Sequence, residues 1–84
     1  MVAFVLSAHA EAAIANRSIE RTWLEQVLEH PQRVESDRVD PAVKHAIGSV
    51  AEHGGRTLRV VYNDTVDPLR IVTAYFDRTL RDKS

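Results

Sequence analysis

The chain has 84 residues, enough for one small domain, and a chain of this size buries only about 60% of its unfolded surface. It contains no cysteine, which excludes disulfides and thiolate metal sites and fits a reducing compartment. Its formal net charge of -1 disfavours generic nucleic-acid binding, because domains of that class are usually basic. We expect a single domain over residues 1–84, with the helices at about 7–30, the sheet at about 33–76 and a tail at 77–84.

The first residues, Met-Val-Ala-Phe-Val-Leu-Ser, form an apolar run that is too short for a signal peptide or a membrane span. We therefore expect a cytoplasmic protein with no membrane association. Residues 4–6 are predicted to be a short extended segment. Ser7 then suits the N-cap of a helix that continues to about Asn16, because its hydroxyl can accept a hydrogen bond from a free amide of the first turn.

A second helix is predicted from Ser18 to His30. Its apolar residues follow helical spacing and its acidic residues occupy the other side, which is the strongest periodic pattern in the chain. Trp23 lies on the apolar side and is interpreted as a core residue. Pro31 ends the helix, because it disfavours helical geometry at the preceding residue and cannot donate the next hydrogen bond.

The rest of the chain has the composition of strands and turns. Residues 33–35 suit a short edge strand, 43–50 alternate weakly, 57–63 are rich in β-branched residues, and 69–76 form the last strand. Gly54 and Gly55 provide a tight reversal between the second and third of these segments. The predicted fold class is α+β, with two N-terminal helices on one face of a small three- or four-stranded antiparallel sheet.

The register of the last two strands decides which side chains face the helices. We expect Val60 to face Val72, because this register collects more large apolar groups beneath the helices; the alternative pairs Val60 with Ile71. In the preferred register Arg59 and Tyr75 project from the other face of the sheet.

Arginine is frequent in and around these two strands, at positions 56, 59, 70 and 78. Residues 1–53 contain five Lys or Arg and eight Asp or Glu, whereas residues 54–84 contain six and four. The arginines could solvate an exposed sheet face, or they could hold a phosphate chain, since a guanidinium donates to two phosphate oxygens at once.

Three segments carry a family resemblance: "LSAHAEAAIANRSIERTWLEQVLEHPQRVE", "GGRTLRVVYN" and "RIVTAYFD". In the first, Ser-x-His-Ala leads a helix, Arg-x-Ile opens the next, and a proline closes it. These segments resemble the bacterial family known as domain of unknown function 4258, which is similar to the BrnT toxins and, more distantly, to the RelE-like toxins of toxin–antitoxin modules. The resemblance covers nearly the whole chain.

The resemblance implies an endoribonuclease that cleaves mRNA without a metal or other cofactor and is neutralised by a cognate antitoxin. Such chemistry needs a base for the ribose 2′-hydroxyl, an acid for the departing 5′-oxygen and cations for the charge on phosphorus. His9 and His45 are the candidate base and acid. Tyr75 is a further candidate acid or a platform for a base. Arg59 is the candidate catalytic cation.

Arg56 and Arg78 are further candidate RNA-binding residues, and Arg17 lies in the motif between the helices. Three of the candidates also have a structural reading: His9 as a packing or hydrogen-bonding residue, His45 as a half-buried strand residue, and Arg17 as a cap for the last carbonyls of the first helix.

Two other functional classes remain open. The domain could be a non-catalytic module that binds a partner helix or strand. It could also be a homodimer in which Val61, Ile71 and Tyr75 meet their counterparts. The expected partners are thus an antitoxin, mRNA or the ribosome, or a second copy.

Overall fold

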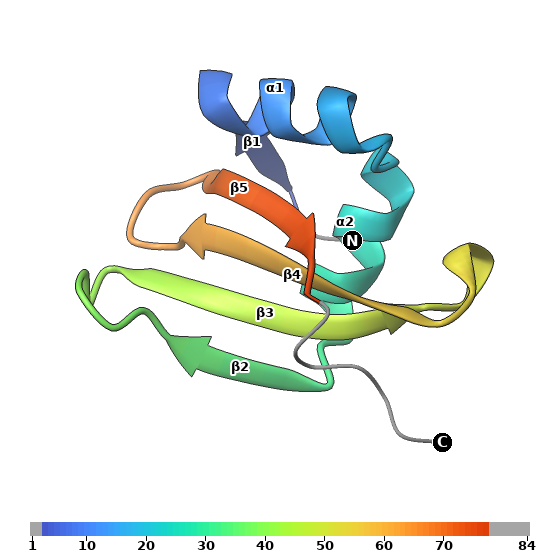
Figure 1. Ribbon diagram of the computed structural model, residues 1–84. Helices are drawn as coiled ribbons and strands as arrows, with labels where there is room; N and C mark the ends of the chain where they lie inside the picture. Colours follow the sequence, from blue (N-terminus) through green and yellow to red (C-terminus); the bar gives the residue numbers. More distant parts are fainter. Residues whose placement is uncertain (1–2, 78–84) are drawn as a thin grey trace.

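The computed structural model describes residues 3–77, which form two helices, a short 3-10 turn and one five-stranded mixed sheet (Figure 1). The sheet has the strand order β1-β5-β4-β3-β2. The elements are β1 (Phe4–Leu6), α1 (Ala8–Arg17), α2 (Arg21–Glu29), β2 (Arg33–Ser36), β3 (Val43–Val50), η1 (Ala51–His53), β4 (Arg56–Asn63) and β5 (Leu69–Phe76). The α+β class is therefore confirmed, whereas the sheet has more strands than expected and is not purely antiparallel.

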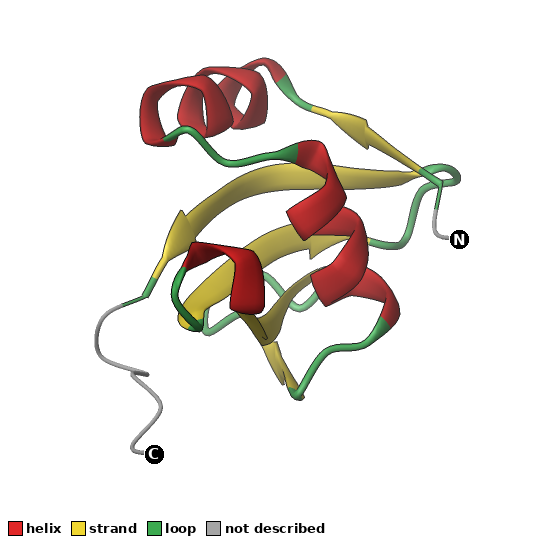
Figure 2. Ribbon diagram, turned by 90° about the vertical axis from the view of Figure 1, so that its right-hand side faces the viewer, coloured by secondary structure: helices red, strands yellow, loops and turns green. Residues whose placement is uncertain are grey.

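Both helices lie on the same face of the sheet (Figure 2). The core between them and the strands includes Leu24 from α2, Leu58 from β4 and Ile71 from β5, each with an exposed fraction of 0%. Trp23 is 7% exposed and belongs to this core, as predicted. Burial of these apolar groups is the main term that holds a domain of this size together.

Two serines flank helix α1 as its cap residues, Ser7 before it and Ser18 after it. The Ser7 hydroxyl accepts a hydrogen bond from the Ala10 amide at 3.0 Å, which confirms its predicted role as N-cap. At the other end Ser18 adopts a left-handed conformation with φ of 55°. This residue turns the chain out of α1, so α2 starts at Arg21 and not at Ser18 as predicted.

The largest difference from the predicted fold is the position of residues 4–6. They form β1, an edge strand that pairs in parallel with β5, Phe4 facing Leu69 and Leu6 facing Ile71. The Ser7 amide donates to the Ile71 carbonyl at 3.1 Å and its hydroxyl donates to the Val72 carbonyl at 3.1 Å. The start of the chain is thereby joined to its last strand.

The predicted pairing of β4 with β5 is also corrected. Val60 faces Ala74, and not Val72 or Ile71, and the register shifts between Val61 and Tyr62. Since Val61 faces Thr73 and Tyr62 faces Ile71, Val72 is an extra residue in β5. Because of this irregularity, the side chain of Ile71 points into the core. Strict alternation counted from Ala74 had placed Ile71 on the opposite face of the sheet. The pair of Arg59 and Tyr75 lies in the regular part of the β4–β5 pairing, and the two side chains share the outer face, as predicted.

No helix within residues 3–77 is long and apolar enough to cross a membrane.

Candidate functional site

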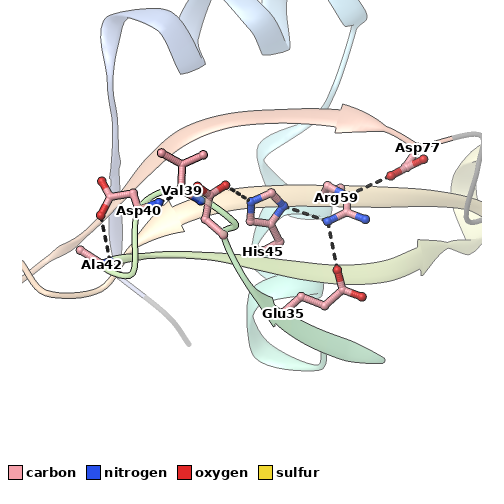
Figure 3. Close-up of polar contacts among 8 residues, drawn as sticks. Glu35, Val39, Asp40, Ala42, His45, Arg59 and Asp77 are labelled. Atoms are coloured by element: carbon pink, nitrogen blue, oxygen red, sulfur yellow. Dashed lines mark hydrogen bonds and ion pairs between the residues drawn. The ribbon is translucent and has the colours of Figure 1, made fainter.

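The sheet face opposite the helices carries a cluster of charged side chains on three neighbouring strands. Glu35 of β2 faces His45 of β3, and Arg59 of β4 faces Tyr75 of β5. These residues alternate along their strands with residues of the helix-covered core, so their side chains point away from it. Two loop carboxylates, Asp37 and Asp77, complete what we call the His45–Arg59 cluster (Figure 3).

His45 and Arg59 are in direct contact. Nη1 of Arg59 lies 2.8 Å from Nδ1 of His45, and Nε2 of His45 lies 2.8 Å from Oδ1 of Asp37. A guanidinium can only donate, so Nδ1 must accept and carries no proton. The ring is therefore in its neutral form with the proton on Nε2, which donates to Asp37. This chain of contacts orients the ring through both of its nitrogens.

Asp37 is held in place by the loop between β2 and β3. Its Oδ2 accepts hydrogen bonds from the amides of Val39 at 3.1 Å and Asp40 at 3.0 Å. The hydrogen bonds from Asp40, from His45 and from Val39 lower the pKa of Asp37 from 3.8 to about 2. Each of them favours the ionised form, and they outweigh the opposing effect of desolvation. Asp37 is thus a fixed negative charge behind the imidazole at neutral pH.

Arg59 also contacts two carboxylates. Its Nε donates to Oδ2 of Asp77 at 2.9 Å, and its Nη1 lies 3.5 Å from Oε1 of Glu35. The side chains of Arg59 and Asp77 are each 12% exposed, whereas that of Glu35 is 42% exposed. The pair with Asp77 therefore anchors the guanidinium, and the longer contact with accessible Glu35 is the one that a ligand can replace most readily.

The structure brings together three of the predicted site residues and separates the others. His45, Arg59 and Tyr75 share the outer face. His9 lies exposed on α1, and therefore on the helix side of the sheet. Arg17 is the last residue of α1.

The remaining two RNA-binding candidates do not join the described cluster. Arg56 begins β4 three positions before Arg59, so strand alternation directs the two side chains to opposite faces. Arg78 lies outside the described residues.

The sequence interpretation missed Glu35, Asp37 and Asp77. Glu35 sits in a strand that was predicted, and its position opposite His45 requires only the pairing of two consecutive strands. Asp37 lies two residues before the sequence Val-Asp-Pro at 39–41, which is typical of a turn, and a carboxylate at such a position often accepts hydrogen bonds from the amides of the turn. Asp77 is brought to Arg59 by the pairing of β4 with β5, and no local pattern indicates it.

The charges of the cluster differ from the group of phosphate-holding arginines that the sequence left open. One guanidinium is surrounded by the carboxylates of Asp37, Asp77 and Glu35, directly or through His45. What the site offers is an oriented imidazole beside a cation, with an accessible carboxylate next to both. Within residues 3–77, no three His, Asp or Glu side chains are grouped so that they could hold a metal ion.

The expected homodimer surface is likewise altered. Ile71 lies in the core, and Val61 on the outer face is 7% exposed. Neither of these two side chains offers a broad apolar surface to a second copy.

Comparison with known families gives one match. The model of the family described as domain of unknown function (DUF4258) matches residues 6–76, and the chain belongs to this family. No curated protein and no solved structure matches the chain. The similarity to BrnT and RelE-like toxins thus stays a prediction.

Proposed function

We propose that this member of the domain of unknown function 4258 family is a toxin-like, metal-independent endoribonuclease that cleaves mRNA and is neutralised by a cognate antitoxin. The observation that carries the proposal is the 2.8 Å contact between the Arg59 guanidinium and the His45 ring. Proton transfer and phosphate binding need these two groups side by side. Asp37 supports the imidazole as the carboxylate of a hydrolase triad does, by stabilising its protonated form.

The cluster suggests a sequence of events. A backbone phosphate attracts the Arg59 Nη1 donors away from Glu35 and from Nδ1 of His45, while Asp77 keeps hold of Nε. Nδ1 is then free to take the proton of the ribose 2′-hydroxyl. The 2′-oxygen bonds to phosphorus, the bond from phosphorus to the 5′-oxygen breaks, and the 5′-oxygen receives a proton from Tyr75. The products would be a 2′,3′-cyclic phosphate and a 5′-hydroxyl.

A second function has its own supporting observation. Arg59 already has carboxylate partners in Asp77 and Glu35, and a cation that is neutralised inside its own domain binds RNA weakly. The same arrangement is expected of a non-catalytic module in which the cluster only stabilises the sheet. The two functions predict different results in a cleavage assay, because a module whose cluster only stabilises the sheet does not cleave RNA.

The test is cleavage of single-stranded RNA by purified protein in the presence of EDTA, with analysis of the new termini. The wild type should produce 2′,3′-cyclic phosphates, and an all-deoxy strand of the same sequence should stay intact because it lacks the 2′-hydroxyl. His45→Ala and Arg59→Ala should each reduce the cleavage rate at least about 100-fold, the lower range for loss of a catalytic acid, base or oxyanion donor.

His9→Ala is the matched control, because His9 lies on the other side of the sheet and should be dispensable. Expression of the wild type should also arrest bacterial growth, and Arg59→Ala should relieve the arrest. Intact RNA and normal growth with folded wild-type protein would support the binding module.

A further inference from the structure

Strand β2 (Arg33–Ser36) forms one edge of the sheet, and β3 is its only strand partner among the described residues (Figure 1). Just after β2, the Asp37 amide donates to the Val43 carbonyl of β3 at 3.0 Å. Backbone groups alternate along an antiparallel strand, so those of Ser36 and Val34 point away from β3. No strand within residues 3–77 pairs with these groups, so they can pair with an added strand.

The same edge exposes apolar surface. Val34 is 49% exposed on the helix-covered side of the sheet, and Val39 in the loop that follows β2 is 90% exposed. They are two of the four large hydrophobic residues that are exposed within residues 3–77. A strand added to this edge would cover Val34 and satisfy its backbone groups at the same time.

The charges of β2 complement those of a second copy of itself. Arg33 and Glu35 flank Val34, with Nε of Arg33 3.0 Å from Oε2 of Glu35. If two β2 strands pair antiparallel about Val34, each Arg33 faces the Glu35 of the other copy and the two Val34 side chains are neighbours. Pairing centred on Glu35 would instead place two carboxylates opposite each other, which is unfavourable.

The other edge of the sheet has no charges that would complement those of a second copy. Strand β1 has the sequence Phe-Val-Leu and no charged side chain that could fix the register of a second copy. Charged side chains, lysine above all, and proline usually protect an edge strand from pairing. Strand β2 has one charge of each sign, in the order that a two-fold axis through Val34 makes complementary.

We propose that the protein forms a two-fold dimer through antiparallel pairing of β2 about Val34, which joins two sheets into one. Arg33 of the partner subunit then lies beside Glu35, which is 3.5 Å from Arg59. The partner thereby adds a cation to the His45–Arg59 cluster and draws Glu35 away from Arg59. The dimer rests on the geometry of this edge, so it stands whether or not the cluster cleaves RNA.

Crosslinking through a single cysteine tests the register. Val34→Cys places one thiol on each side of the axis, at a Cα separation of about 5.5 Å for a hydrogen-bonded pair, which a disulfide can span. The chain has no other cysteine. Under mild oxidation Val34→Cys should form a covalent dimer at least about tenfold faster than Val39→Cys, because only the first thiol lies on the axis. Equal rates would overturn the proposed register.

Sedimentation of the uncrosslinked protein over a range of concentrations tests the dimer itself. The wild type should show a reversible dimer, and Glu35→Arg should weaken it at least about tenfold by placing like charges opposite each other. The double exchange Arg33→Glu with Glu35→Arg should restore it, because the complementarity is only inverted. Circular dichroism checks that each variant is folded. A wild type that stays monomeric to about 1 mM, or pairs at this edge only with a different protein, would overturn the proposal.

Discussion

Arg59 donates a hydrogen bond to Nδ1 of His45 across neighbouring strands, and this contact fixes where the proton of the imidazole lies. Nδ1 is an acceptor, so the proton is on Nε2 and is shared with Asp37. We expect ¹⁵N-edited NMR at neutral pH to show a protonated Nε2 and an unprotonated Nδ1 for His45, with slow exchange of the ring proton. The exposed rings of His9 and His30 should exchange rapidly and are the internal controls. A His45 proton on Nδ1 would contradict the arrangement.

The ion pair between Arg59 and Asp77 should stabilise the fold more than an exposed pair does. Both side chains are 12% exposed, so removal of one leaves the other poorly solvated. A double-mutant cycle with Arg59→Met and Asp77→Asn should give a coupling free energy of about 1–3 kcal/mol in urea unfolding.

The matched control for that cycle is Lys44 with Asp64, whose contact is equally short at 2.9 Å but whose side chains are 41% and 38% exposed. Its coupling should be clearly weaker than that of Arg59 with Asp77, as is typical of surface pairs. Similar couplings for the two pairs would mean that burial does not distinguish them.

Asp37 should make stability depend on pH in the acid range. Its pKa is lowered from 3.8 to about 2 in the folded state, so between these values the unfolded chain binds more protons. The contribution of Asp37 is fully present above about pH 4 and is lost as the pH falls through 2. Urea midpoints measured from pH 6 to pH 2 should therefore fall less steeply for Asp37→Asn than for the wild type. Asp67→Asn, which removes an exposed carboxylate from the loop between β4 and β5, is the matched control.

Ser18 is expected to limit stability through its backbone. It is exposed and has φ of 55°, a conformation that costs a residue with a Cβ about 1–2 kcal/mol and glycine almost nothing. Ser18→Gly should raise the free energy of unfolding by about 0.5–1 kcal/mol after the loss of backbone entropy. Ala15→Gly, at an exposed position inside α1, should lower it by about 1 kcal/mol. Destabilisation by both substitutions would show that Ser18 makes a contribution beyond its backbone conformation.

The sequence predicted regular elements well because their patterns are local. The bounds of β3 and β5 match the predicted 43–50 and 69–76, and α1 was placed by its N-cap Ser7. Strand β1 has only three residues, too few for a period, and its partner β5 begins more than 60 positions later. Ile71 lies in the core in place of the predicted Val72 because the register of β4 and β5 shifts. Regular alternation of apolar residues in a sequence cannot reveal such a shift.

In the candidate site, too, residues in regular strands could be predicted better than residues in loops. Arg59 and Tyr75 could be placed on one face because each belongs to a strand whose alternation is visible in the sequence. His45 lies in residues 43–50, which alternate only weakly, so its face was not predicted. Asp37 and Asp77 lie in irregular segments, and their contacts depend on where the strands bring the loop ends. Their acidic side chains were counted only as part of the net charge, although they decide how the guanidinium is held.

The link between Ser7 and Val72 spans 65 positions and has a consequence for synthesis. During translation β1 has no strand to join until β5 has been made, so α1 and α2 leave the ribosome before their packing surface is complete. Asp77 follows β5, and Arg59 therefore gains its anchor last of all. A nascent chain leaves the ribosome with the guanidinium unanchored, and the finished cluster forms only after residue 77 has emerged.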